Sequence, residues 1–184
     1  ELAIVRRIKQ EGLTAVSLTA TPASTANSVE SAGIRVDGYD SLVQTTTNKL
    51  RATRGEVRWR PKPRHAPANI VKFVQATGYA YLLYAYGAAD NYISVYGNAA
   101  NTVTLAFNDG GGAHSTTWDC TAAWTANESL TFRVEYTAAY MKLWLANAVV
   151  ATITTAVNFA TVPTTIYYSS NATGNGIDTV ILEV

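Results

Sequence analysis

The stretch LTFRVEYTAAYMKLWLANAVVATI at residues 130–153 decides the fold class of this chain. Apolar and polar side chains alternate along it in successive runs, and a short turn separates the runs. The apolar side of the first run is formed by Leu130, Phe132, Val134 and Tyr136. A period of two is typical of β-strands with one buried face, and burying each large apolar side chain stabilises the fold by roughly 1.5–3 kcal/mol. The stretch therefore predicts an antiparallel hairpin whose apolar side points into a core.

The rest of the chain from Gly33 onward repeats this pattern in short runs separated by Gly, Asn and Asp. The expected strands cover residues 34–36, 42–47, 56–60, 70–75, 79–86, 92–96, 102–107, 129–136, 140–145, 149–153, 164–169 and 177–184. Many short strands with frequent turn residues are typical of a sandwich or barrel. The sequence contains no long amphipathic helix of the kind that a parallel βαβ fold requires. We therefore predict an all-β, antiparallel fold.

The first residues of the chain differ from the rest in composition. Residues 1–10 favour a short helix, residues 13–20 a strand, and residues 21–31 a loop rich in Ser, Thr, Ala and Asn. The chain has 184 residues, which is enough for one domain with a sizeable core. We interpret residues 1–31 as an N-terminal arm and residues 32–184 as a single sandwich domain.

Charge is distributed unevenly, although the formal net charge is only +1. Residues 1–72 carry a surplus of six positive charges and residues 73–184 a surplus of five negative charges. This asymmetry favours complementary surfaces, between copies of the chain or with a scaffold protein. The candidate docking residues are Arg6, Arg7 and Lys9 in the arm and the stripe Arg58, Arg60, Lys62 and Arg64. One interpretation of the stripe is a docking surface for an acidic partner or an anionic polysaccharide. The alternative is an ordinary solvated strand face. Nucleic-acid-binding domains are usually more basic, so no nucleic-acid partner is expected.

The single cysteine and the short apolar runs narrow the class of protein. Cys120 has no partner for an intrachain disulfide and none for a cysteine-based zinc site. We expect a small buried hydrophobe there, with an intermolecular disulfide as the alternative.

No stretch approaches the roughly 18 apolar residues that span a bilayer, so no membrane span is expected. The chain starts at Glu1 without the apolar run of a signal peptide, which is compatible with a processed N-terminus.

Four pieces of the sequence carry a family resemblance. They are residues 38–42 with 46–50, GEVRWRP at 55–61, Trp124 followed by 130–153, and IDTVILEV at 177–184. In this order and spacing, residues 33–184 resemble the concanavalin A-like lectin/glucanase superfamily in its laminin-G-like branch. The resemblance implies a jelly-roll β-sandwich. Relatives often carry Asp-Gly at the tip of the long hairpin, where this chain has Ala146-Asn147. Because Asn tolerates positive φ, we expect the turn to form there.

The acidic residues do not favour catalysis. The glucanase members of the superfamily carry acids spaced as Glu-x-Asp-x-x-Glu on one strand, and a retaining glycosidase needs two carboxyls about 5 Å apart. This chain lacks that cluster, and its two histidines, His65 and His114, belong to no recognisable Ser-His-Asp pattern. We therefore expect no enzymatic activity.

Closely spaced tyrosines are the first candidates for a ligand site. Six of them follow one another as Tyr79, Tyr81, Tyr84, Tyr86, Tyr92 and Tyr96. Ile93 and Val95 alternate with Tyr92 and Tyr96, which places these two tyrosines on an outer face. Tyrosine rings suit the apolar faces of sugar rings as well as protein interfaces, and the alternative is simple packing in the sandwich. We predict Tyr92, Tyr96 and Asn98 as ligand-binding residues, whereas the four tryptophans are expected to pack in the core or at its rim.

The loop DGGGAH at residues 109–114 is the second candidate. As a rim loop it would contact a ligand or a cation through Asp109 and His114. Calcium takes six to eight oxygen ligands, of which Asp109, Asn108 and Asn101 would supply only some. The alternative is a flexible glycine connection. No cofactor is otherwise expected, and the identity of any metal stays open.

Three functional hypotheses follow. The first is a non-catalytic structural and adhesion module on the exterior of a virion, as a decoration or fibre protein, or on an extracellular appendage. Its arm would anchor it to another copy or to a scaffold protein, and surface glycans are a further partner. The low charged fraction of 15%, the abundance of Thr, Ala and Tyr, the distinct arm and the oppositely charged halves motivate it. The alternatives are a free carbohydrate-binding lectin domain and, third, a glucanase-type hydrolase.

Overall fold

The computed structural model describes residues 29–30, 33–37, 42–45, 50–70, 79–169, 171 and 176–183. These residues contain thirteen β-strands and one short 3-10 helix, Pro67–Asn69. The strands are β1 (Val29–Glu30), β2 (Gly33–Asp37), β3 (Leu42–Thr45), β4 (Gly55–Pro63), β5 (Ala80–Ala88), β6 (Asn91–Ala99), β7 (Thr102–Asp109), β8 (Ala113–Asp119), β9 (Phe132–Thr137), β10 (Tyr140–Leu145), β11 (Ala148–Ile153), β12 (Thr165–Tyr168) and β13 (Asp178–Glu183).

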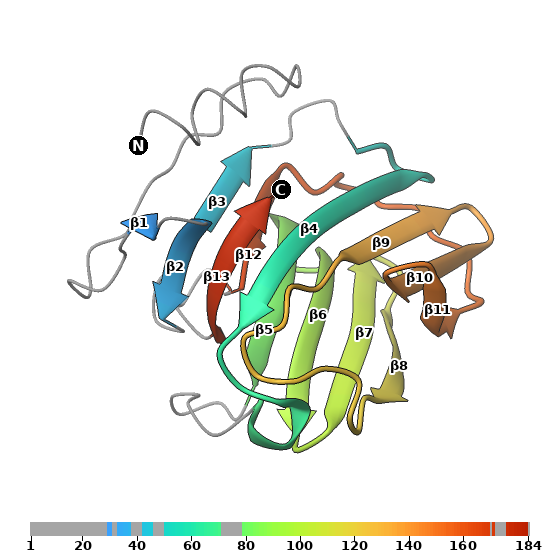
Figure 1. The fold of residues 1–184 in the computed structure, drawn as a ribbon. Helices are drawn as coiled ribbons and strands as arrows, with labels where there is room; N and C mark the ends of the chain where they lie inside the picture. Colours follow the sequence, from blue (N-terminus) through green and yellow to red (C-terminus); the bar gives the residue numbers. More distant parts are fainter. Residues whose placement is uncertain are drawn as a thin grey trace.

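The described strands form two sheets that pack face to face (Figure 1). The front sheet has the order β1-β2-β13-β4-β9-β10-β11, and the back sheet has the order β3-β12-β5-β6-β7-β8. Neighbouring strands are antiparallel throughout both sheets. The last strands of the chain, β12 and β13, lie between strands from its first half, so the chain passes repeatedly from one sheet to the other. The predicted antiparallel jelly-roll β-sandwich is confirmed.

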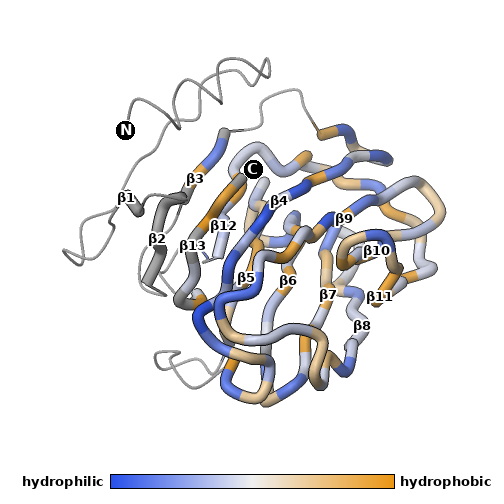
Figure 2. The backbone as a smooth tube through the Cα atoms, in the orientation of Figure 1, coloured by the Kyte–Doolittle hydropathy of each residue, from blue (hydrophilic) through white to orange (hydrophobic). Residues whose placement is uncertain are grey.

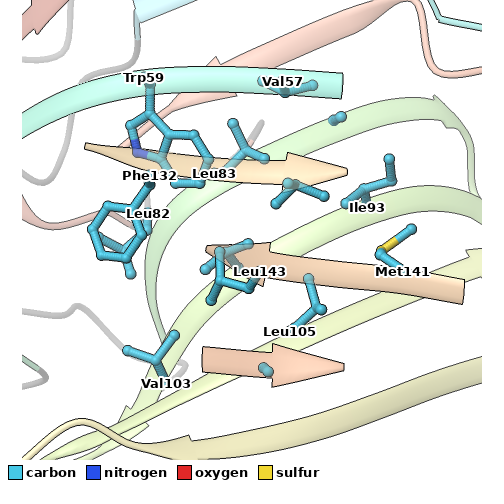
Figure 3. Packing of buried hydrophobic residues seen from close by; sticks show 14 of the residues in the cluster. Val57, Trp59, Leu82, Leu83, Ile93, Val103, Leu105, Phe132, Met141 and Leu143 are labelled. Atoms are coloured by element: carbon cyan, nitrogen blue, oxygen red, sulfur yellow. The ribbon is translucent and has the colours of Figure 1, made fainter. Parts of the chain in front are cut away.

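The core lies between the two sheets (Figure 3). Trp59 of β4 stacks on Phe132 of β9 with their ring centroids 5.3 Å apart, and residues such as Leu83 and Ile93 meet them from the back sheet. Hydrophobic and hydrophilic residues alternate along β9 (Figure 2), so that Phe132, Val134 and Tyr136 are buried. The alternation read from the sequence therefore gives the correct inward face for this strand.

The long hairpin forms as expected, with one difference at its tip. Residues Tyr140 to Leu145 of β10 pair with β9 on one side and β11 on the other. The positive φ belongs to Ala146, at 52°, and not to Asn147. The pair Leu145 and Ala148 closes a two-residue turn, and turns of the type II′ class require positive φ at the first central position. The hydrogen bond from Ala146 N to Thr131 O, 2.7 Å long, holds this conformation.

Two described strands were not expected from the sequence. Only the first two residues of β8 fall in the glycine-rich loop 109–114, and residues 115–119 were assigned to no element. The inward positions of β8 are His114, Thr116 and Trp118, which give no aliphatic alternation. β1 falls in a segment that was assigned to a loop. Ile70 was expected to open a strand, but it ends the 3-10 helix instead.

Other expectations have mixed outcomes. The expected helix at 1–10, the strand at 13–20 and residues 71–75 lie outside the described residues. Cys120 is fully buried, as expected, and burial raises the pKa of its thiol to about 11. In the described part of the chain, no helix is long and apolar enough to cross a bilayer.

Candidate ligand-binding site

Tyrosines gather on the outer face of the back sheet. The strands β5 and β6 direct their aliphatic residues inward, where Leu83, Ile93 and Val95 are fully buried. The outward positions are left to aromatic side chains, which are only partly buried. We call this surface the tyrosine face and define it by Tyr79, Tyr81, Tyr84, Tyr86, Tyr92, Tyr96 and Tyr167.

A β-bulge brings the tyrosines of β5 to one side. Tyr81 and Tyr84 are three residues apart, and strict alternation would place them on opposite faces. The register between β5 and β6 shifts between Tyr81 and Leu83, and both Leu82 and Leu83 are fully buried. Because two successive leucines point inward, the tyrosines before and after them share the outer face.

The rings of the tyrosine face touch one another in a continuous series. Their centroids are 5.0 Å apart for Tyr79 and Tyr96, 5.4 Å for Tyr96 and Tyr81, and 5.7 Å for Tyr81 and Tyr84. Tyr84 continues the series to Tyr92 at 5.8 Å, Tyr86 at 6.0 Å and Tyr167 at 6.2 Å. These separations are typical of interacting aromatic pairs. Each ring therefore supports its neighbours, and the surface is preorganised.

Most rings of the tyrosine face are partly buried, and the burial affects the titration of three of them. Ser94 lies on the same face between Tyr92 and Tyr96, yet it is only 2% exposed, so the surrounding tyrosines cover it. Burial, followed by the neighbouring Tyr81 and Tyr92, raises the pKa of Tyr84 to about 12. Burial also raises the pKa of Tyr81 and of Tyr96. Tyr81, Tyr84 and Tyr96 thus offer neutral phenol groups that can donate and accept hydrogen bonds.

Polar amides lie beside the tyrosines. Asn98 follows Tyr96 by two residues at the exposed end of β6. Asn108 of β7 pairs in register with Tyr92, and its Oδ1 accepts a 3.0 Å hydrogen bond from Gly110 N. The structure therefore places Tyr92 and Tyr96 on one outer face, as alternation predicted, and Asn98 is exposed two residues further on, where the register between β6 and β7 shifts.

Asp109 and His114 lie apart from that face. The carboxylate of Asp109 accepts hydrogen bonds from the backbone N–H groups of Gly111 and Asn158, each 3.0 Å long. His114 packs against the core residue Phe107, with the ring centroids 5.1 Å apart. Asp109 ends β7 and His114 belongs to β8, so only residues 110–112 connect the two strands. The hydrogen bond from Asn158 holds the segment before β12 against the end of β7.

The calcium hypothesis gains no support from this geometry. Both oxygens of the Asp109 carboxylate accept backbone hydrogen bonds, and Asn108 Oδ1 does the same. Nowhere in the described part of the chain do three His, Cys, Asp or Glu residues lie together in a way that could hold a metal ion.

The basic stripe lies on the opposite side of the molecule, on the outer face of the front sheet. Along β4 the inward residues Val57, Trp59, Pro61 and Pro63 are buried, and Arg58, Arg60, Lys62 and Arg64 alternate with them. Glu56 shares the face of the stripe, as parity predicted, and forms an ion pair with Arg58. The arm residues Arg6, Arg7 and Lys9 lie outside the described residues.

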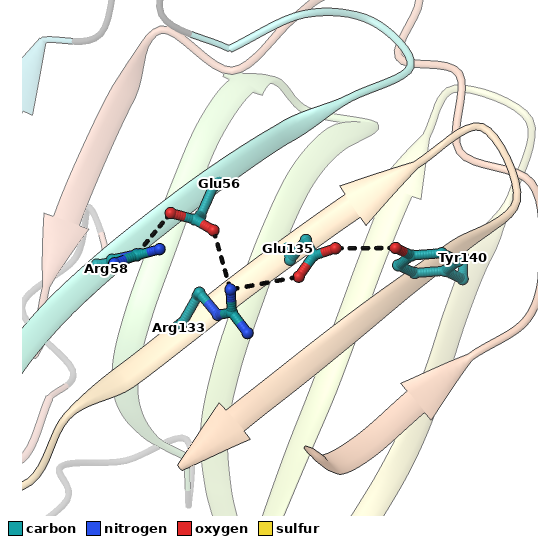
Figure 4. A network of polar contacts seen from close by, with 5 residues as sticks. All are labelled: Glu56, Arg58, Arg133, Glu135 and Tyr140. Carbon is teal, nitrogen blue, oxygen red and sulfur yellow. Dashed lines mark hydrogen bonds and ion pairs between the residues drawn. The ribbon is translucent and has the colours of Figure 1, made fainter. Parts of the chain in front are cut away.

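A polar network connects β4, β9 and β10 on this outer face (Figure 4). Arg133 Nη1 contacts Glu56 Oε2 at 3.3 Å and Glu135 Oε2 at 3.6 Å, and Tyr140 donates a 2.8 Å hydrogen bond to Glu135. The guanidinium carbon of Arg133 also lies 4.1 Å from the ring centroid of Trp144. Trp144 thus packs on the sheet surface, whereas Trp59 and Trp124 are buried in the core.

Glu56 and Glu135 form a carboxylate pair that the sequence did not predict. They stand directly opposite each other in the register of β4 and β9, far apart in the chain. A retaining glycosidase uses two carboxyls about 5 Å apart with the sugar bond between them. Here the guanidinium of Arg133 lies between the two carboxylates. The position that a scissile bond would need is therefore taken by a cation.

Comparisons with known proteins agree on the fold. No family model and no curated protein matches this sequence. Mouse laminin α1 chain domains LG4-5 match with a TM-score of 0.56 at 14% identity, over 81% of this chain and 39% of that one. The chain thus spans about two fifths of the laminin fragment.

Two further solved structures come from sugar-related proteins. The CBM40 of Ruminococcus gnavus IT-sialidase, bound to α2,3 sialyllactose, has a TM-score of 0.51 at 13% identity, over 85% of this chain and 86% of that one. Crh5 transglycosylase in complex with NAG has a TM-score of 0.54 at 12% identity, over 91% and 78%. At these identities the likeness defines the fold of this chain, a laminin-G-like jelly-roll sandwich.

Proposed function

We propose that this chain is a non-catalytic carbohydrate-binding module whose tyrosine face holds the glycan. The observation that carries the proposal is the series of ring contacts from Tyr79 to Tyr167 across three strands of the back sheet. Stacking on aromatic rings buries the apolar face of a sugar, and phenol hydroxyls meet the sugar hydroxyls at its rim. Preformed rings also lower the entropy cost of binding, because little rearrangement is needed.

The absence of catalysis is proposed from the residues of this chain, since the fold itself is shared with a transglycosylase. The strands β5, β6 and β12, which carry the tyrosine face, contain no Asp or Glu. The opposed pair Glu56 and Glu135 lies on the other sheet and is bridged by Arg133. A general acid and a nucleophile are therefore not supplied beside the proposed glycan site within the described residues.

The test is a comparison of glycan binding by wild-type protein and two tyrosine variants. We expect wild-type protein to bind at least one glycan of a broad array with a Kd between about 1 mM and 1 μM. Tyr84→Ala, at the centre of the tyrosine face, should weaken binding at least tenfold, about 1.4 kcal/mol. Tyr140→Ala on the front sheet is the matched control and should leave affinity unchanged. A flat array, or equal loss in both variants with native circular dichroism, would count against the proposal.

We further propose that the module works on an exterior surface, either a virion or an extracellular appendage, with residues 1–31 as its anchor. The support is the distinct composition of residues 1–31 and the opposite charge of the two halves of the sequence. The test compares the assembly state of the full chain and of residues 32–184 by analytical ultracentrifugation and electron microscopy. Unchanged assembly of the shortened chain would contradict an anchoring role.

A further inference from the structure

The tyrosine face is uncharged, and this limits the chemistry of its ligand. The strands β5, β6 and β12 contain no charged residue. On the adjoining β7, Val103, Leu105 and Phe107 are fully buried, so alternation directs Thr104, Ala106 and Asn108 outward. The stripe on β4 and the cation Arg133 belong to the outer face of the other sheet.

Among the described residues of this surface, a sugar acid would therefore meet no counter-ion. A carboxylate or sulfate that loses water without gaining a cationic partner is strongly disfavoured. The charged residue nearest in the chain is Asp90, in the turn after Tyr86, and it would repel an anion. Neutral sugar hydroxyls, in contrast, find phenol and amide partners along the whole face.

The rings form a track that follows the strands. Contacts run from Tyr79 and Tyr96 at one end of the β5–β6 pair, through Tyr81 and Tyr84, to Tyr86 and Tyr92 at the other end. From Tyr79 to Tyr86 the chain advances roughly 20 Å, at about 3.3 Å per residue and allowing for the bulge. This length accommodates several sugar units in an extended chain and exceeds what one monosaccharide can cover.

From these observations we infer that the ligand is an uncharged linear oligosaccharide that lies along β5 and β6 and stacks on successive tyrosines. This inference rests on the proposed function. It adds the chemical class of the ligand and its orientation along β5 and β6. Affinity should rise with chain length until the track is filled, because each added unit contacts a further ring. Charged oligosaccharides of the same length should bind more weakly.

The experiment is isothermal titration calorimetry of the full chain with defined probes. The neutral probes are cello-, manno- and xylo-oligosaccharides from the disaccharide to the hexasaccharide, and the charged probes are sialyllactose and oligogalacturonate. We expect at least tenfold tighter binding of a neutral hexasaccharide than of its disaccharide, and at least tenfold weaker binding of the charged probe of matched length. Tyr79→Ala and Tyr86→Ala, at the two ends of the track, should weaken hexasaccharide binding but not disaccharide binding. Tyr84→Ala should weaken both.

The outcomes separate this inference from the proposed function. Binding that is lost in Tyr84→Ala but is independent of chain length, or that favours the charged probes, overturns the inference and leaves a glycan site in place. If no probe binds and none binds on the array, both fail. A dimer of the wild-type chain that Tyr84→Ala dissociates would assign the face to a second copy and also overturns both. Circular dichroism and urea unfolding of each variant exclude a loss of fold as the cause.

Discussion

The hydroxyl of Tyr136 on β9 donates a 2.7 Å hydrogen bond to the carbonyl oxygen of Arg51, which lies 85 residues earlier in the chain. The same ring lies against Gly55, where an added Cβ would come within 2.6 Å of it. One buried tyrosine thus fixes the segment that leads into β4 and closes one end of the sandwich.

Removal of this hydroxyl should destabilise the fold. Tyr136→Phe keeps the ring but leaves the Arg51 carbonyl without this donor, so we expect the free energy of unfolding to fall by about 1–2 kcal/mol. Urea unfolding measures the change. Tyr140→Phe removes a hydroxyl that bonds the partly exposed Glu135 and should cost less. An equal loss of unfolding free energy in both variants would show that the hydrogen bond to Arg51 stabilises the fold no more than the bond to Glu135 does.

Alkaline pH should destabilise the protein in a defined window. Burial raises the pKa of Tyr136 from 10.0 to about 12, and burial also raises the pKa of Tyr168. The unfolded chain releases these protons near pH 10, whereas the folded chain keeps them. The unfolded state therefore binds fewer protons between about pH 10 and 12, and stability falls as pH rises through that range.

Unfolding experiments at a series of pH values check this expectation. The stabilisation that comes from these two tyrosines should be fully present below pH 10. Above pH 10, Tyr136→Phe should reduce the slope of the unfolding free energy against pH. A slope that is the same in this variant as in the wild type would contradict the assignment to Tyr136.

Arg133 should stabilise the front sheet mainly by separating two acids. Arg133→Ala leaves Glu56 and Glu135 facing each other across β4 and β9 and uncovers Trp144. We expect a loss of about 1–2 kcal/mol, because like charges directly opposite destabilise a sheet and the cation–π contact is lost.

A second substitution distinguishes repulsion from lost packing. Glu135→Gln in the Arg133→Ala background, or added salt, should restore part of the stability if repulsion dominates. Arg58→Ala is the control, since Arg58 is well exposed and its ion pair with Glu56 should be worth less than about 1 kcal/mol. Full insensitivity to salt and to Glu135→Gln would assign the loss to packing on Trp144 alone.

Asp109 should act as a structural acceptor. Asp109→Ala leaves the N–H groups of Gly111 and Asn158 without their acceptor, so we expect a loss of about 1–3 kcal/mol in thermal or urea unfolding. Asp90→Ala in the exposed β5–β6 turn is the control and should change stability little. A rise in wild-type Tm on addition of calcium that Asp109→Ala abolishes would instead support a calcium site.

Local patterns predicted much of the strand layout. The hairpin of β9, β10 and β11 and the inward face of β9 follow from alternation alone, because side-chain direction in a strand has a period of two. The same rule placed Tyr92 and Tyr96 outside. It failed for β8, whose edge position needs no aliphatic face, and for the turn at Ala146.

The candidate site was only partly predictable, because it depends on which strands become neighbours. Tyr167 joins the tyrosine face because β12 pairs with β5 and sets Tyr167 opposite Tyr84. Glu56 meets Glu135 for the same kind of reason. Tyr81 and Tyr84 share a face because of a bulge, and no local sequence signal fixes its position.

The sequence by itself determined that the chain forms antiparallel strands with one apolar and one polar side, since that property belongs to each strand separately. Tertiary structure alone decided that six tyrosines from three strands, together with Tyr79 just before β5, make one continuous surface. It also decided that Arg58 and Arg133 lie on the other sheet. The physical reason is that hydrophobic burial selects the inward face of a strand locally, whereas the neighbours of its outward face are chosen by the packing of the whole chain.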